Sequence, residues 1–80
     1  MSCADPFDTV AEALRCKRED LSINSAKYRT HGWDSFGHLA VILALEQTYG
    51  ISIDDASIEK YATMTAIVQL FENQRYVEAQ

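Results

Sequence analysis

The sequence predicts an all-α fold, a small four-helix bundle with three longer helices, one short helix and a long loop between the first two. Apolar residues recur at the spacing of a helix face in residues 7–14 and again in residues 64–71. The longest apolar run lies in between and precedes Gly50, a natural helix stop. Eighty residues suffice for a single domain, residues 1–80, whose core we expect at about 5–73 between frayed termini.

The first helix is expected to begin at Asp5 and Pro6, because aspartate caps free N–H groups and proline is tolerated at the first helical position. Its apolar stripe predicts a helix that runs to about Lys17. Polar and turn-forming residues then predict a long loop up to Trp33, which should anchor the loop on the core. Three further apolar residues should also pin this loop: Leu21, Ile23 and Tyr28.

Asp34 and Ser35 open the second helix, which is apolar on nearly every side and should therefore be contacted by several elements. Ile51 or Ile53 should plug the core from a connector too short to form a sheet. A short helix is expected to start at Asp54 or Asp55 and to continue through Ile58 and Tyr61, and Thr63 or Thr65 should cap the last helix. The expected core comprises Val10, Leu14, Leu39, Ile42, Leu43, Leu45, Ile67, Val68 and Phe71, with Met64 facing either the core or a partner.

A net charge of −5 disfavours nucleic acid and anionic membranes as partners and favours a protein with a basic patch. The longest apolar run, Leu39–Leu45, is far shorter than the roughly 20 residues of a membrane span. The first residues lack the features of a secretory signal, so we expect a cytoplasmic protein, and we also expect it to be a monomer. Cys3 and Cys16 are expected to be reduced, and the spacing of the cysteines and histidines predicts no metal site.

The most informative segment is Gly32–Leu39, which places a serine hydroxyl at the start of the most apolar helix. The first turn of a helix favours a bound phosphate, so Ser35 is well placed to carry an anionic group. Gly37 should leave open space beside it, and the Asp34 carboxylate could bind a metal ion during phosphoryl transfer. His38 is expected to be exposed, either touching that phosphate or simply solvated. Asp-Ser alone is more often a structural cap.

The surroundings of this pair resemble the acyl carrier protein family. The resemblance spans about residues 7–71 and is carried by Asp34-Ser35-Phe36, Leu39, the run Ile42–Glu46, Tyr49, Ile53, Asp54-Asp55, Glu59-Lys60-Tyr61 and Thr63. It implies a non-catalytic carrier whose Ser35 receives 4′-phosphopantetheine from coenzyme A through a separate phosphopantetheinyl transferase. The thiol of that arm would hold an acyl thioester and present it to partner enzymes. Asp34 would take part in the attachment step, and Gly37 and His38 would lie near the arm.

The resemblance also implies that partners dock mainly on the second helix. The docking residues would be Phe36, Ala40, Val41, Leu43, Glu46, Gln47, Asp54, Asp55 and Glu59. Four carboxylates among them, those of Glu46, Asp54, Asp55 and Glu59, would steer the encounter. Ala40 and Gln47 stand where fatty-acid carriers commonly have glutamates, which favours specialised partners over general fatty-acid synthesis. The cargo stays open: an acyl group of a fatty-acid, polyketide or other specialised pathway, or an aminoacyl group as in D-alanyl carriers.

Two alternatives come from other functional classes. Ser35 and His38 share a helix face and could suggest a hydrolase, but the Gly-x-x-Ser-x-Gly spacing misses the nucleophile elbow by one residue, and no strand precedes it. A chain of this size is also too small for a shielded catalytic pocket. The other alternative is a small acidic interaction domain with no prosthetic group.

Overall fold

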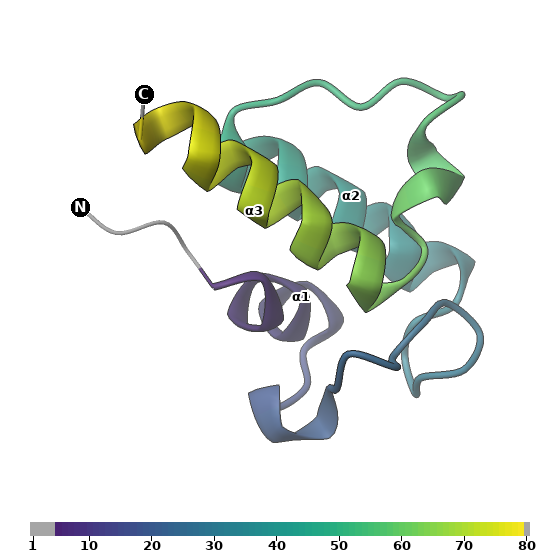
Figure 1. Cartoon of the computed structure of the whole chain (residues 1–80). Helices are drawn as coiled ribbons and strands as arrows, with labels where there is room; N and C mark the ends of the chain where they lie inside the picture. The colour runs from purple at the N-terminus through teal and green to yellow at the C-terminus, as the bar shows by residue number, and fades with distance from the viewer. Residues whose placement is uncertain (1–4, 80) are drawn as a thin grey trace.

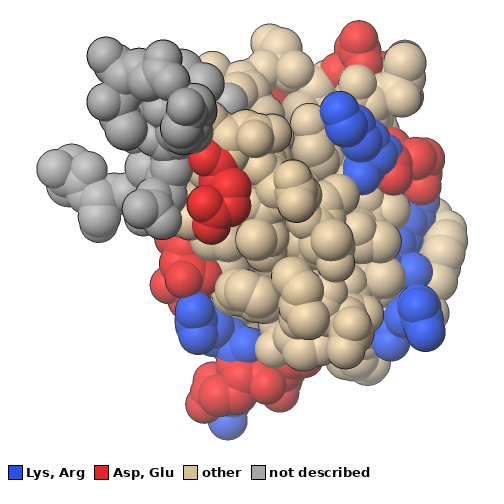
Figure 2. All heavy atoms as spheres, viewed as in Figure 1, with Lys and Arg blue, Asp and Glu red and all other residues tan. Residues whose placement is uncertain are grey.

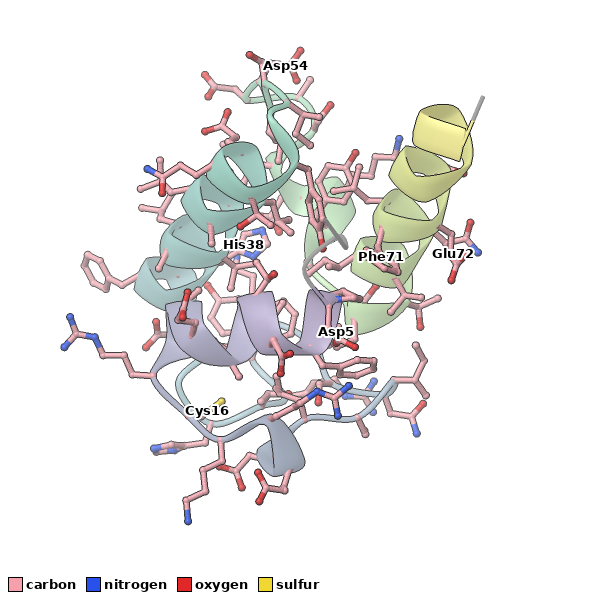
Figure 3. All side chains as sticks on the ribbon, turned by 90° about the vertical axis from the view of Figure 1, so that its left-hand side faces the viewer. Asp5, Cys16, His38, Asp54, Phe71 and Glu72 are labelled. Carbon is pink, nitrogen blue, oxygen red and sulfur yellow. The ribbon has the colours of Figure 1, made fainter. Side chains whose placement is uncertain are left out.

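The computed structural model describes residues 5–79, with side chains described for residues 5–73. The N-terminal end and the Cys3 thiol expected from the sequence therefore lie outside the described residues, whereas the C-terminal end, expected to be frayed after about residue 73, is helical up to Ala79. The all-α bundle is confirmed, and its elements are α1 (Pro6–Leu14), the 3-10 turn η1 (Arg18–Asp20), α2 (Ser35–Tyr49), the 3-10 turn η2 (Ile58–Tyr61) and α3 (Met64–Ala79). α2 and α3 run in the same general direction (Figure 1), and α1 lies across the end at which both begin (Figure 3).

α1 begins as predicted but ends early. The Asp5 carboxylate accepts a hydrogen bond from the Phe7 N–H at 2.8 Å, and Pro6 occupies the first helical position. The predicted extension to Lys17 is wrong, because Arg15 adopts a left-handed conformation (φ 58°) that closes the helix after Leu14. Burial would raise the pKa of Asp5, yet the hydrogen bonds from Arg18 and from Phe7, together with the Arg18 charge, lower it overall.

The loop between α1 and α2 is attached to the start of α3. Its residues 25–27 form backbone hydrogen bonds to Ala62 and Met64, and Ala26 pairs with Thr63 in an isolated bridge. Leu21 and Trp33 are buried, as predicted for anchors. The same prediction is wrong for Ile23 and Tyr28, which are 46% and 70% exposed because hydrogen bonds rather than apolar contacts hold this part of the loop.

α2 has two apolar faces, of which only one is covered. Val41, Ile42 and Leu45 are buried in the core. Leu39 and Leu43, predicted as core, are instead 51% and 58% exposed. The expectation that neighbouring elements cover nearly every side of this helix is wrong, since the described residues supply no element over this second face.

The connection from α2 to α3 differs from the expected short helix. Gly50 ends α2 in a left-handed conformation (φ 65°). The Asp54 carboxylate then accepts a hydrogen bond from the Ser57 N–H at 3.0 Å, which makes a turn, and the helical segment begins only at Ile58. Thr63 caps α3, as predicted, by accepting the Ala66 N–H at 3.2 Å.

The core lies between the inner faces of the three α-helices. Its buried apolar residues are Val10, Ala11, Leu21, Trp33, Val41, Ile42, Leu45, Met64, Ile67 and Leu70. Met64 is completely buried, so of its two predicted orientations it adopts the one that faces the core and not a partner. Leu14, Ile51, Ile53, Val68 and Phe71 pack against this core while staying partly exposed. Within residues 5–79, no helix is both long and apolar enough to cross a membrane.

Candidate functional site

Ser35 is the first residue of α2, and Asp34 caps the helix in front of it. One Asp34 carboxylate oxygen accepts the Gly37 N–H at 2.9 Å, and the Asp34 carbonyl accepts the His38 N–H at 2.8 Å. Among the described residues, the N–H groups of Ser35 and Phe36 have no intramolecular acceptor. Free N–H groups and the positive end of the helix dipole together favour a negatively charged group at this position.

The Ser35 side chain is exposed, and its hydroxyl contacts a residue that sequence reasoning did not associate with it. The Tyr28 hydroxyl lies 2.5 Å from Ser35 Oγ, a hydrogen bond in which either oxygen can donate. Tyr28 is seven residues earlier and in a loop, so no helical spacing could have indicated the contact. It depends on how residues 26–33 close upon themselves.

Gly37 does not leave open space, contrary to the prediction. A Cβ at this position would lie 2.1 Å from the Gly32 carbonyl oxygen and 3.0 Å from a methyl carbon of Leu14. The loop in front of α2 therefore crosses directly over the helix backbone. The missing side chain of Gly37 lets the two backbones approach closely, and this approach holds Ser35 in place. It does not make room for an attached group.

His38 is 2% exposed, so both predicted forms of an exposed histidine are wrong. Its ring lies on the inner side of α2 (Figure 3). Nδ1 accepts a hydrogen bond from the Trp33 indole N–H at 3.1 Å, which leaves the proton on Nε2 for donation to the Ile58 carbonyl at 2.8 Å. His38 thus joins the loop, α2 and η2. Since both ring nitrogens are occupied, it is no base for Ser35, which argues against the hydrolase alternative.

The predicted docking residues of α2 divide between the surface and the core. Phe36 is 84% exposed, Gln47 is exposed and Ala40 is half-buried. The prediction that Val41 is a docking residue is wrong, because its side chain has no exposed surface. The exposed apolar residues Phe36, Leu39 and Leu43 follow one face of the helix, and we call them the α2 patch.

Most of the predicted steering carboxylates already have partners inside the protein. Glu46 accepts the Ile53 N–H at 2.8 Å, and Asp54 caps the turn described above. Glu59 pairs with the Lys27 ammonium at 2.7 Å; this hydrogen bond lowers the pKa of Glu59 and raises that of Lys27. Asp55 is exposed. The face of the molecule over α3 is uncharged at its centre, with acidic and basic side chains interspersed around its edge (Figure 2).

Figure 3 places Asp54 beyond the end of α2, far from α1 and from the end where Ser35 lies. At about 1.5 Å per residue, the 15 residues of α2 separate its two ends by about 20 Å.

Among the described side chains, no group of three histidine, cysteine, aspartate or glutamate residues lies close enough together to hold a metal ion. The site therefore consists of one exposed hydroxyl, its neighbouring carboxylate and an apolar helix face.

Comparison with known proteins identifies the family. Residues 7–71 match the family described as "Phosphopantetheine attachment site". The chain belongs to this family. It is also similar to a protein named "Acyl carrier protein" from Campylobacter hominis, with 32% identity over 66 residues that cover 82% of this chain and 84% of the relative. The family assignment confirms the resemblance to acyl carrier proteins, and with it the cofactor, a covalently attached 4′-phosphopantetheine.

The geometry around Ser35 fits this prosthetic group. A phosphodiester on an exposed hydroxyl would meet the free N–H groups of the first turn, and an arm attached there can extend into solvent without a cavity. Members of the family are carriers that interact with phosphopantetheinyl transferases and with acyl-processing enzymes. A carrier needs an accessible attachment point more than a catalytic pocket.

Proposed function

We propose that this protein carries an acyl group as a thioester on 4′-phosphopantetheine attached to Ser35, and that it presents this cargo to the enzymes of a specialised acyl pathway in the cytoplasm. The observation that carries the proposal is the exposed Ser35 hydroxyl at a helix start with free N–H groups. The name of the Campylobacter relative favours an acyl cargo over an aminoacyl one. Nothing in the described structure favours the alternative of an interaction domain that lacks a prosthetic group.

In the attachment step, Ser35 Oγ attacks the phosphorus of coenzyme A that bears the pantetheine. The phosphoanhydride bond breaks, 3′,5′-ADP leaves, and the serine proton passes to a base of the transferase. The N–H groups of Ser35 and Phe36, which have no acceptor among the described residues, would stabilise the negative charge of the attached phosphate. Asp34 uses one carboxylate oxygen as the helix cap, and its second oxygen accepts no hydrogen bond from the described residues, so it is available to a metal ion of the transferase.

The arm, once attached, supplies a thiol that holds the acyl group as a thioester. The protein itself contributes position and recognition. We propose that the transferase and the acyl-processing enzymes dock on the α2 patch, because it adjoins Ser35 and is apolar and exposed. Such contacts should be small and transient, since one carrier must bind and leave several enzymes in turn.

The attachment site is tested with a Ser35→Ala variant. Incubation with coenzyme A and a promiscuous phosphopantetheinyl transferase should add one phosphopantetheinyl group to the wild-type chain and none to the variant, because the hydroxyl proposed as the nucleophile has been removed. Intact-protein mass spectrometry measures this directly. Ser52→Ala, which removes another exposed serine, is the matched control and should be converted fully. The proposal fails if the wild-type chain stays unmodified while a reference carrier is converted, or if Ser35→Ala is converted equally well.

Docking is tested away from the chemistry with Leu43→Ala, about two helical turns from Ser35. We expect kcat/KM of the transferase for this variant to fall about five- to tenfold through a higher KM, as expected when an apolar contact worth about 1 kcal/mol is lost. Ile23→Ala, an exposed apolar residue outside α2, should behave like wild type. Of the four predicted steering carboxylates only Glu59 is paired with a cation, and Glu46 and Asp54 keep their charge because a backbone N–H does not neutralise a carboxylate, so kcat/KM of the transferase should fall as the salt concentration rises. An unchanged KM in Leu43→Ala would argue against docking on this face.

A further inference from the structure

We propose that Tyr28 is a ligand of the prosthetic group: in the modified protein its hydroxyl donates to the phosphodiester on Ser35 and holds the base of the arm against residues 26–33. The inference rests on the proposed attachment at Ser35. It gives a defined role to a loop residue that would otherwise count as an exposed aromatic side chain.

The first step is the contact itself. The Tyr28 and Ser35 oxygens are 2.5 Å apart, although both side chains are exposed and no burial forces them together. The loop is instead closed by its own hydrogen bonds: the Tyr28 N–H donates to the Trp33 carbonyl, and the N–H groups of Arg29 and Thr30 both donate to the Ala26 carbonyl. A closed loop holds the Tyr28 ring over the start of α2 before any group is attached.

The second step is the backbone of Tyr28. Its φ of 68° is in the left-handed region, which glycine or asparagine adopts easily and which costs other residues about 1–2 kcal/mol. A tyrosine at such a position exposes 70% of its surface, so it does not recover this cost by burial. In this conformation the hydroxyl reaches Ser35, a hydrogen bond that neither glycine nor asparagine at this position would supply from a phenol ring.

The third step is the charge around the ring. The Lys27 ammonium lies 5.1 Å from the centre of the Tyr28 ring and is held there by Glu59, so η2 also supports the tyrosine. In the unmodified protein either hydroxyl can donate. After modification the serine oxygen has no proton and the neighbouring oxygens are anionic, so only Tyr28 can donate. A hydrogen bond to an anionic oxygen is shorter and stronger than one between two neutral hydroxyls, and the contact therefore gains strength on attachment.

The experiment compares ³¹P NMR spectra of the modified wild-type protein with those of two modified variants. Tyr28→Phe keeps the ring and removes only the hydroxyl. Tyr61→Phe is the matched control, because a lysine ammonium also lies over the Tyr61 ring, at 5.8 Å, but the ring makes no contact with Ser35. We expect the ³¹P resonance of Tyr28→Phe to be displaced by more than its linewidth and to narrow as the phosphate moves more freely. The resonance of Tyr61→Phe should coincide with that of wild type.

Amide NMR spectra separate a lost hydrogen bond from a rearranged loop. The amide signals of residues 29–33 should keep their dispersion in Tyr28→Phe, since their hydrogen bonds do not involve the tyrosine side chain. Coinciding ³¹P resonances in wild type and Tyr28→Phe overturn the proposal while leaving attachment at Ser35 intact. Equal displacements in both tyrosine variants overturn it as well. A wild-type chain that accepts no prosthetic group defeats the proposed function, and this inference with it.

Discussion

Gly37→Ala is expected to destabilise the domain by about 3 kcal/mol or more, the upper end of the range for overpacking. The new Cβ would lie 2.1 Å from the Gly32 carbonyl oxygen, and a backbone atom cannot rotate away as a side chain can. Either the loop or the start of α2 must shift. A domain of this size has about 4–12 kcal/mol of stability in total, so the loss is a large fraction of it.

Chemical denaturation followed by the fluorescence of Trp33 measures this loss, because Trp33 is the single tryptophan and is buried beside the same loop. Gly50→Ala is the control: it places a methyl group in open space and costs only the strain of a left-handed alanine, about 1 kcal/mol. Comparable losses in the two variants would show that the close approach over Gly37 contributes nothing. The modification rate of Ser35 should fall with Gly37→Ala and stay unchanged with Gly50→Ala.

His38→Ala is expected to cost about 3 kcal/mol. The substitution leaves the Trp33 indole N–H and the Ile58 carbonyl without their partner, and buried polar groups that lose a partner cost about 1–3 kcal/mol each. It also opens a cavity where a buried ring had been. η2 should loosen, because it loses the hydrogen bond that the Ile58 carbonyl accepts from His38.

Hydrogen exchange of the amides in residues 58–61 reports this local effect, and denaturation reports the global one. His31→Ala removes an exposed histidine and should change stability by less than about 0.5 kcal/mol. The loss from His38→Ala should be smaller in a Trp33→Phe background, since the indole N–H is then absent already. Strictly additive losses would contradict the proposed coupling between Trp33 and His38.

Together these contacts explain how so small a domain holds its serine in place. Gly37 brings the loop onto α2, and His38 connects the loop to η2. The Lys27–Glu59 pair joins the same two segments at the surface. Ser35 lies where these segments meet, so its position depends on contacts between parts of the chain that are far apart in sequence.

The helical elements could be predicted because their signals are local. Asp5 with Pro6, Asp34 with Ser35, Gly50 and Thr63 each act within a few residues, and helix caps and stops depend on little else. The end of α1 was missed since Arg15, a residue with good helix propensity, adopts a left-handed conformation there. The start of η2 was missed because Asp54 caps a turn instead of a helix, and the helical segment begins only after that turn.

The sequence by itself determined the all-α class, the starts of the three α-helices and the serine at the head of the second helix, since periodicity and capping are properties of neighbouring residues. Only the tertiary structure decided which apolar face of α2 is buried, since both faces have the same chemistry and the packing of α1 and α3 selects one. It also decided the contacts of Gly37, His38 and Tyr28, whose partners lie 5 to 23 positions away in the sequence. Such contacts follow from how the loop closes onto the helices, which no local pattern encodes.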